Sequence, residues 1–476
     1  MLRASELGSS DPNRDEPPEG GSSGARPASV ARNTFWSLAA EGMRLVSGLG
    51  TFLILVRVYE PRLFGIFVAT TGVFAFAFPQ ASVGAGWLVL RRVASENWRP
   101  EEALSRAFGM VFLGGAVVGI GLVALRPLLL PEASLALFLG IGISEMILIG
   151  LVEVTLFAAQ ATEKLIAKAA VWTTFGVGRL VAALAIFLVL DEPDLSVWVG
   201  ANILVSVVVL IIAQLLTVGR LVRPRWPLML DIRQGIPFSV GFGADRLRNV
   251  SDTVMLVRFG FDTDAGLYSA ARRLINVAQT PIIATQHATN ARLFQAGSES
   301  VASCRRLAMR LTALAVLFGF AAMLAIALLG RPLVSLLSDS YRDVGQVMVW
   351  MSFLPMMLAL ETFAGMALTA SGHHGRRVAL NLLTGGVNVV LNLVLIPIHG
   401  WRGAVVATLT SSLVYSTGLW ATLAWAVRKE ASDHGIVDPL AALHPRGTGD
   451  RRLSPGRMGR IRGCLGGSRW PGGDSS

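Results

Sequence analysis

Charge is scarce in this chain. Asp, Glu, Lys and Arg make up only 15% of its 476 residues, whereas ordinary soluble domains contain about 25% charged residues. Apolar residues make up 53% of the chain, and the mean hydropathy is +0.57. This imbalance excludes an ordinary soluble protein, which at this length would have about three domains.

Cysteine and histidine are also rare. The two cysteines, Cys304 and Cys464, are too few and too poorly placed for a disulfide framework or a cysteine-based metal site. His373 and His374 form the only histidine cluster, which we interpret as loop polarity rather than as a metal site. We therefore expect no metal and no other cofactor.

Motifs for catalysis and for secretion are missing as well. The chain has no glycine-rich nucleotide loop, no Asp-x-Asp pair at a helix end and no serine-nucleophile signature. Residues 1–30 lack the apolar core of a cleavable signal peptide. We expect a protein that is not an enzyme, with an uncleaved first membrane helix.

Long apolar runs, by contrast, are abundant. Each run has about 20 residues, enough for a helix to cross about 30 Å of hydrocarbon. No run alternates in polarity with a period of two, so the sequence does not indicate a membrane β-barrel. The sequence predicts an all-α membrane protein with twelve transmembrane helices. The expected spans are residues 33–56, 64–90, 107–125, 133–159, 166–190, 195–219, 236–259, 266–289, 308–329, 344–370, 377–398 and 403–427.

Composition also predicts the parts of the chain and their orientation. Loops on one side carry more than twice as many Lys and Arg residues as loops on the other, which places them and both termini in the cytoplasm. We expect a multi-pass protein of the cytoplasmic membrane that contacts lipid. These basic loops explain most of the net charge of +11, so no nucleic-acid partner is expected. The expected parts are a disordered tail (1–32), a first lobe (33–222), an interfacial connector (223–235), a second lobe (236–427) and a disordered basic tail (428–476).

An internal repeat relates the two halves. Residues 56–69 align with residues 257–270 at an offset of 201. Other pairs fall at nearly the same spacing, namely Gly42 with Gly243, Pro79 with Pro281 and Glu153 with Glu361. An even number of helices per repeat gives both copies the same orientation. The repeat predicts two pseudo-symmetric six-helix bundles around a central cavity.

Charged residues inside the spans are candidates for the lining of that cavity. A charge at mid-bilayer costs at least about 2.5 kcal/mol and usually faces a partner or a wet cavity. In the seventh span Asp245, Arg248 and Asp252 share one helical face. In the first span Arg44, Ser47 and Thr51 occupy the equivalent positions of the repeat, and Glu41 lies one turn before Arg44. Salt bridges within each helix, which merely allow insertion and packing, are the alternative interpretation.

Further polar residues and prolines lie in other spans. Arg272 and Arg273 are adjacent in the eighth span, and at least one of them is expected to point inward because both cannot easily reach the interface. The isolated carboxylates Glu145, Glu153 and Glu361 could carry a proton, because burial favours the neutral acid, or could be inert packing residues. Pro79 and Pro281 each remove a helix hydrogen bond and are candidate hinges, with static kinks as the alternative.

Several segments resemble one family of transporters: Asn33–Ser37, Arg57–Phe67, Asp252–Leu256, Gly266–Leu274, Leu391–Ala404 and Ala407–Thr408. Across residues 31–427 the chain resembles the polysaccharide transporter family, the O-antigen (Wzx-like) flippase type of the multidrug, oligosaccharidyl-lipid and polysaccharide (MOP) exporter superfamily. His399 and Trp401 depart from the common pattern around Gly400, as does the long basic tail.

The resemblance implies a MATE/MOP-like fold and a flippase that moves a polyprenyl-diphosphate-linked oligosaccharide across the membrane by ion-coupled alternating access. Arg44, Arg248 and Arg272 or Arg273 would then bind the diphosphate, because arginine offers permanent charge and several donors to phosphate oxygens. Glu153 and Glu361, with the acids of the seventh span, would couple the ion. A polysaccharide polymerase is a possible partner.

Three other functions stay open. A cation-coupled drug exporter of the same superfamily would favour carboxylates and aromatic surface over arginine. A lipid II flippase is closer in chemistry but usually has two further helices, which are not found after Val427. A membrane-embedded glycan polymerase or ligase would need a larger outward loop than this chain offers.

Overall fold

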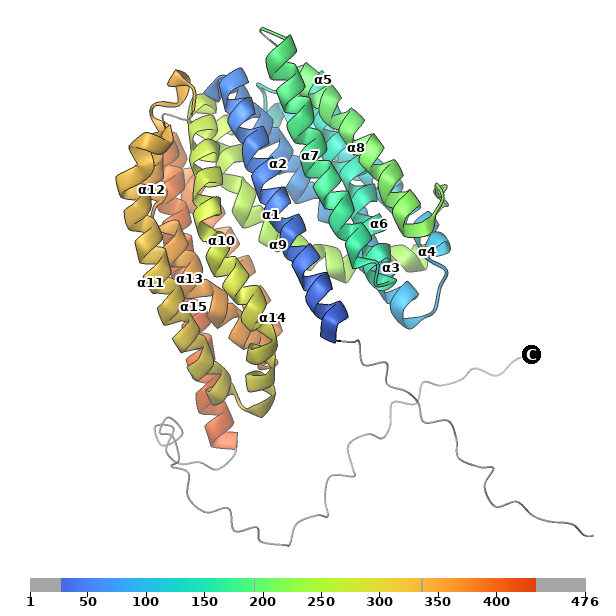
Figure 1. Cartoon of the computed structure of the whole chain (residues 1–476). Helices are drawn as coiled ribbons and strands as arrows, with labels where there is room; N and C mark the ends of the chain where they lie inside the picture. The colour runs from blue at the N-terminus through green and yellow to red at the C-terminus, as the bar shows by residue number, and fades with distance from the viewer. Residues whose placement is uncertain (1–26, 192, 335–336, 434–476) are drawn as a thin grey trace, which may run out of the picture. The chain divides into compact units, whose positions relative to one another are not determined.

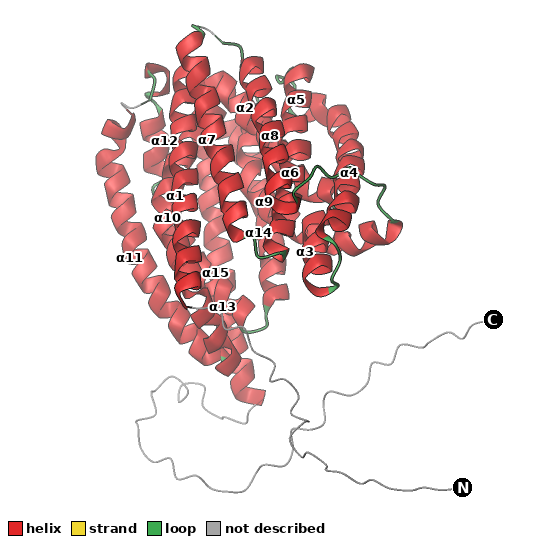
Figure 2. Ribbon diagram, turned by 45° about the vertical axis from the view of Figure 1, so that its right-hand side comes forward, coloured by secondary structure: helices red, strands yellow, loops and turns green. Residues whose placement is uncertain are grey.

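The chain folds into helices joined by short turns, and no strand occurs in the residues that the structure describes (Figure 2). The structure is a computed structural model that describes residues 27–191, 193–334 and 337–433, without the side chains of 27–41, 237–238, 240–249, 329, 331 and 333. The predicted disordered tails lie largely outside this description. The chain divides into two compact units, Met1–Trp425 and Ala426–Ser476, and both helical halves described below belong chiefly to the first.

The helices of the first half follow the six predicted spans in order. Two spans are interrupted: α2 and α3 share the second, and α5, the π-helical η1 and α6 share the fourth. The elements are α1 (Pro27–Val58), α2 (Pro61–Ser82), α3 (Ala85–Ser95), α4 (Pro100–Leu129), α5 (Leu135–Gly142), η1 (Ile143–Leu148), α6 (Ile149–Ala161), α7 (Leu165–Val189) and α8 (Leu195–Val218).

The second half begins after a non-helical connector and again follows six spans. Its tenth span is divided between two helices that meet at an angle of 43°. The elements are α9 (Met229–Arg258), α10 (Asp262–Glu299), α11 (Val301–Val334), the 3-10 turn η2 (Asp339–Tyr341), α12 (Val344–Met351), α13 (Leu354–Ala370), α14 (His374–His399) and α15 (Trp401–Asp433).

Within the described residues, fewer than twelve helices are both long enough and apolar enough to cross a membrane. In the described part of the chain eight helical segments pass, or nine if the bent pair of α12 and α13 counts as one span. Three long helices, α1, α9 and α10, are not among them. Charged residues run along α9 and α10, as expected for helices that face a polar interior. The structure is that of a multi-pass membrane protein, and twelve crossings stay a prediction.

The break between α2 and α3 has a local cause in the backbone. Val83 (φ 47°) and Gly84 (φ 67°) both adopt the left-handed conformation, which ends the hydrogen-bonded helix. This conformation is unusual for a β-branched residue. The π-helical turn η1 inserts an extra residue into the fourth span and carries Glu145. Such turns are frequent at functional sites.

The two halves pack on each other through α2. In Figure 1 the helices α3–α8 gather on one side and α11–α15 on the other, with α1, α2 and α9 between them. α2 packs on α9 and α10, whereas α9 also contacts α3, α4 and α14. α9 therefore bridges the halves rather than belonging to one lobe alone.

One end of the bundle is joined by direct contacts between the halves. The Tyr341 hydroxyl donates to the carbonyl of Tyr59 at 3.1 Å, and Arg62 pairs with Asp262 at 3.4 Å. Phe64 packs edge-on against the Tyr341 ring. We call the contacts of these five residues the joined end; the predicted orientation places it outside the cell.

Candidate functional site

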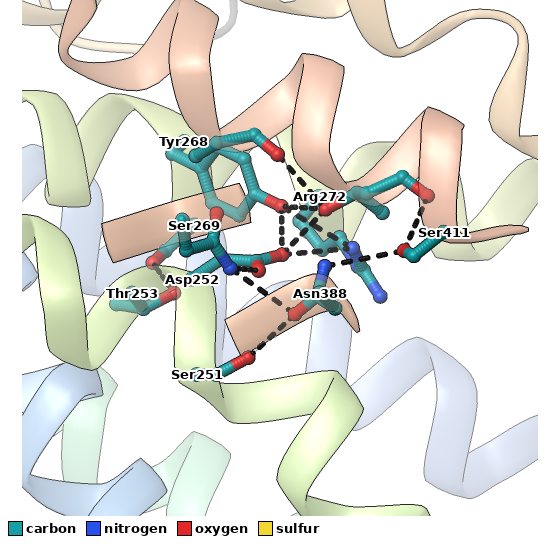
Figure 3. A network of polar contacts seen from close by, with 11 residues as sticks. Ser251, Asp252, Thr253, Tyr268, Ser269, Arg272, Asn388 and Ser411 are labelled. Carbon is teal, nitrogen blue, oxygen red and sulfur yellow. Dashed lines mark hydrogen bonds and ion pairs between the residues drawn. The ribbon is translucent and has the colours of Figure 1, made fainter. Parts of the chain in front are cut away.

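A buried carboxylate organises the second half. Asp252 on α9 is 1% exposed and accepts hydrogen bonds from Tyr268 on α10 (2.5 Å), Asn392 on α14 (2.6 Å) and Thr408 on α15 (2.7 Å). Four helices thus converge on one carboxyl group, which Figure 3 shows at the centre of a polar network. A buried polar network of this kind fixes the relative positions of its helices only while its members stay paired.

Arg272 supplies a positive charge to this network. Its Nη1 lies 3.9 Å from an Asp252 oxygen and 3.4 Å from the Tyr268 hydroxyl. The Glu361 carboxylate on α13, which is 8% exposed, also acts electrostatically on the Arg272 guanidinium. Arg272 is therefore turned into the second half, beside two carboxylates.

Uncharged side chains extend the network along α14. Asn388 accepts from Ser251 at 2.8 Å and from Asn392 at 3.1 Å, and its own amide donates to Ser411 at 3.2 Å (Figure 3). The Asn392 amide oxygen is buried without a hydrogen-bond partner. Buried polar atoms rarely lack a hydrogen-bond partner. This oxygen is therefore available to accept a hydrogen bond from a donor or to coordinate a cation.

A cavity of about 450 Å³ opens between α1 of the first half and α10 of the second. Its lining combines two arginines with apolar and small residues, namely Arg44, Gly48, Phe52, Arg273 and Asn276. At about 1.5 Å per helical residue, Arg44 lies about 21 Å from the end of α1 and Arg273 about 16 Å from the start of α10. Each arginine therefore lies well inside its own helix, one in each half, and Arg44 is exposed whereas Arg273 is partly exposed.

Arg273 is held by aromatic rings. Its guanidinium carbon lies 5.5 Å from the ring centre of Phe52 and 5.8 Å from that of Phe64. These cation-π contacts keep the charge at the edge of the cavity without neutralising it. Arg272 and Arg273 are consecutive on α10 and therefore point in different directions. Arg272 contacts the buried network, whereas Arg273 lines the cavity.

The first half has its own partly buried ion pair. Arg179 on α7 lies 3.7 Å from Glu145 in η1 and 5.6 Å from the ring centre of Trp198. Asn202 donates to Ser144 at 2.7 Å and to Glu145 at 3.4 Å. Arg179 and Glu145 both act electrostatically on Arg273. Arg273 lines the cavity, and the Arg179–Glu145 pair is close enough to act on its charge.

The structure separates the other predicted residues from this cavity. Glu153 lines a different, small cavity of about 110 Å³ together with Pro79, Phe78 and, from α9, Ser239. Pro281 lies inside α10 and is exposed. The side chains of Glu41, Asp245 and Arg248 lie outside the described residues, and the roles of all these residues stay predictions.

The sequence analysis did not identify Tyr268, Asn392 or Thr408 as site residues. A signal was present in α14, where Asn381, Asn388 and Asn392 are spaced by seven and four residues and share one face. Amides at that spacing in a membrane helix indicate a buried polar stripe.

Comparison with known proteins gives the fold. No family model matches the chain, and no curated protein matches its sequence. Among solved structures, the lipid II flippase MurJ in an inward closed conformation is similar, with a TM-score of 0.62 and 10% sequence identity. The match covers 81% of this chain and 87% of the MurJ chain.

Other MOP-superfamily transporters are similar. A Pyrococcus furiosus transporter, described as having a binding pocket of reversed polarity, has a TM-score of 0.56 at 13% identity and covers 83% of this chain and 95% of its own. An outward-facing MATE multidrug transporter has a TM-score of 0.55 at 15% identity, covering 85% and 96%. The predicted all-α membrane fold is confirmed: this chain shares the fold of the MOP-superfamily transporters.

Proposed function

We propose that this protein is a flippase that moves a polyprenyl-diphosphate-linked oligosaccharide across the cytoplasmic membrane. The observation that carries the proposal is the pair Arg44 and Arg273, which line one cavity of about 450 Å³ from opposite halves. A diphosphate cannot cross hydrocarbon unpaired, and two permanent cations offer it several charge-assisted hydrogen bonds. The polyprenyl tail would stay in lipid while the sugars occupy the cavity.

The MurJ likeness supports a lipid-linked substrate, because that protein is by name a lipid II flippase. A drug exporter is the rival, since MATE transporters share the fold. The described lining of the cavity favours an anionic substrate, because its charged residues are Arg44 and Arg273, and the nearby Arg179 is paired with Glu145. A cationic drug would meet repulsion there. Polymerase partners are a prediction from the resemblance alone.

We further propose that Asp252 couples the movement to an ion. Protonation or cation binding at Asp252 would weaken its attraction for Arg272, which lies 3.9 Å away. Arg272 shares a backbone with Arg273, so a turn of α10 that follows the change at one arginine also moves the other. The energy of an ion gradient would thereby reach the diphosphate site through a single helix. Glu361 is a second candidate because it acts on the same guanidinium.

Transport in proteoliposomes tests the proposal. Lipid-linked oligosaccharide is added to vesicles that contain the full chain, and sugars that reach the lumen are counted by their protection from an added glycosidase. Arg44→Ala and Arg273→Ala should each lower the rate about 10- to 100-fold, because each removes hydrogen bonds from a charged group. Lysine at either position should restore part of the rate.

Arg342→Ala is the matched control, since Arg342 is 77% exposed and pairs with an exposed Asp339. It should transport like the unmodified protein. Undiminished transport by Arg44→Ala and Arg273→Ala would remove the cavity from the mechanism. Saturable binding of a lipophilic cation such as tetraphenylphosphonium, without binding of polyprenyl diphosphate, would instead favour drug export.

A further inference from the structure

The connector between the halves is fixed to the surface of α4. Its Arg225 amide donates to the Ser105 carbonyl at 2.8 Å, and the Ser105 hydroxyl donates to the Arg223 carbonyl at 2.6 Å. Gly109, one turn further along α4, leaves the space that the Arg225 carbonyl occupies, because a Cβ there would overlap it. At its start, the Val222 amide donates to the Gln214 side chain at 2.7 Å. The connector is an ordered part of the molecular surface.

A basic cavity of about 360 Å³ lies where the connector meets the start of α4. Its charged lining residues are Arg99, Arg220, Arg223, Arg225, Glu101 and Glu102. Both glutamates are engaged, Glu101 with Arg220 at 3.6 Å and Glu102 with Arg106 at 3.3 Å. Within the described part of the chain, Arg99, Arg223 and Arg225 form no ion pair. The cavity therefore carries an excess of exposed positive charge.

An apolar groove of similar volume, about 360 Å³, continues from this cavity along α4. It is lined by Phe112, Leu113, Ala116, Pro224, Arg225 and Trp226. Trp226 is 82% exposed, and the following Met229 is 78% exposed. Arg225 lines both the basic cavity and the apolar groove, so the two hollows adjoin at this residue.

We infer that the basic cavity and the apolar groove together bind one anionic phospholipid of the surrounding bilayer. Its phosphate would lie among Arg99, Arg223 and Arg225, and one acyl chain would follow the groove past Phe112 and Ala116. Free phosphate or nucleic acid would use the arginines and leave the groove empty, whereas a lipid uses both. Tryptophan at the polar–apolar boundary suits an interfacial position. The basic loops predict the cytoplasmic leaflet, where anionic lipids attract such segments.

Native mass spectrometry of the purified full chain tests this site with phosphatidylglycerol and with phosphatidylcholine of identical acyl chains. The unmodified protein should retain phosphatidylglycerol preferentially. Arg223→Gln with Arg225→Gln should weaken its binding about 25-fold, because one surface arginine contributes about fivefold. Ala116→Trp should weaken binding by filling the groove while all charges remain. Arg342→Gln, a change of an exposed arginine outside the site, should have no effect.

Four results would overturn the inference. The first is equal retention of the two lipids by the unmodified protein. The second is unchanged phosphatidylglycerol binding in both the double arginine variant and Ala116→Trp, each shown to be folded by its elution and helical circular dichroism. The third is competition by soluble glycerol 3-phosphate at the same concentration as the lipid, which would identify a free-phosphate site. Displacement of phosphatidylglycerol by equimolar polyprenyl diphosphate would likewise assign the site to substrate.

Discussion

Gly65 on α2 and Gly266 on α10 pack against each other at the joined end, in a reciprocal arrangement. A Cβ on Gly65 would overlap the Asp262 carbonyl, and a Cβ on Gly266 would overlap the Pro61 carbonyl. Gly65 and Gly266 are 201 residues apart, as are Pro61 and Asp262, which is the offset found in the sequence repeat. The two glycines thus occupy equivalent positions, one in each half, where the backbones come closest.

Adding one methyl group at this crossing should loosen it. We expect Gly65→Ala to destabilise the protein by about 1 to 3 kcal/mol, because overpacking against backbone cannot be relieved by side-chain movement. Thermal unfolding in detergent measures the effect. Gly121→Ala on α4 is the matched control, since nothing lies within 4 Å of its new Cβ. Equal melting temperatures for the two variants would contradict the importance of the close crossing.

The charge of Asp252 should matter more for transport than for binding. Asp252→Asn keeps the shape and can still accept hydrogen bonds, but removes the negative charge that lies 3.9 Å from Arg272. We expect polyprenyl diphosphate to bind nearly as before, whereas acceleration of transport by an ion gradient is lost. Tyr268→Phe removes one donor and retains the charge, so it should reduce the acceleration only in part. Gradient-driven transport by Asp252→Asn at the normal rate would exclude the proposed coupling role.

Glu145 should lower the affinity of the cavity for anions. Its carboxylate lies 3.7 Å from Arg179 and acts on Arg273. Glu145→Gln should tighten binding of polyprenyl diphosphate about 3- to 10-fold, since roughly 1 kcal/mol of Coulomb energy is involved. Glu132→Gln, a change of an exposed carboxylate at the joined end, provides the comparison. Weaker binding by Glu145→Gln would show that the anion does not approach this side of the cavity.

A buried ion pair should contribute strongly to stability. Arg92 on α3 pairs with Asp231 at the start of α9, with side chains 7% and 1% exposed. We expect Arg92→Ala to cost about 3 to 5 kcal/mol because an unpaired carboxylate stays buried. The double variant with Asp231→Ala should recover part of this loss in a double-mutant cycle. Additive losses would mean that the pair acts through packing alone.

Asp194, at the start of α8, should stabilise the folded protein in a pH-dependent way. Its carboxylate accepts from the Leu195 amide and the Ser196 hydroxyl, and donation from Ser196 is the main reason that the pKa of Asp194 lies below its ordinary value. Because the pKa is lower in the folded protein, the Asp194 carboxylate stabilises the fold at pH values above its ordinary pKa of 3.8. This stabilisation is lost as the pH falls through the pKa that Asp194 has in the folded protein.

Asp194→Asn should therefore melt lower than the unmodified protein at pH 7, and the difference should vanish when the pH is low enough to protonate the acid. Asp194→Ala should cost about 1 kcal/mol more, because the helix loses its N-cap. Unfolding temperatures over a pH series measure both effects. A difference between Asp and Asn that does not change with pH would contradict the role of the charge.

Much of the fold was predictable from long apolar runs, because a helix is what satisfies the backbone in lipid. The order of the helical segments and the polarity of α9 and α10 both follow from the sequence. The left-handed Val83 was not predictable, since no local preference of valine favours it. The extra residue in η1 likewise has no sequence signal, because its hydrogen bonds depend on neighbouring helices.

The site was predictable only where charge made a residue conspicuous. Arg44, Asp252 and Arg273 stand out because lipid excludes them. Tyr268 and Thr408 are ordinary side chains in a helix, and only the packing of α10 and α15 around α9 brings them to one carboxylate. The different surroundings of Arg272 and Arg273 could not be predicted either, since they depend on how α10 is rotated within the bundle.

The interruption between α2 and α3 determines which residues of neighbouring helices can lie against it. Where the helix stops, the Val83 carbonyl lies against Gly235 on α9 and the Ala81 carbonyl lies against Gly114 on α4, since a Cβ at either glycine would overlap the oxygen. Gly84 and Glu153 border the same small cavity, which has room for a few molecules of solvent. Helices α4 and α9 can therefore approach the interruption because each presents a glycine there, next to a cavity that a carboxylate borders.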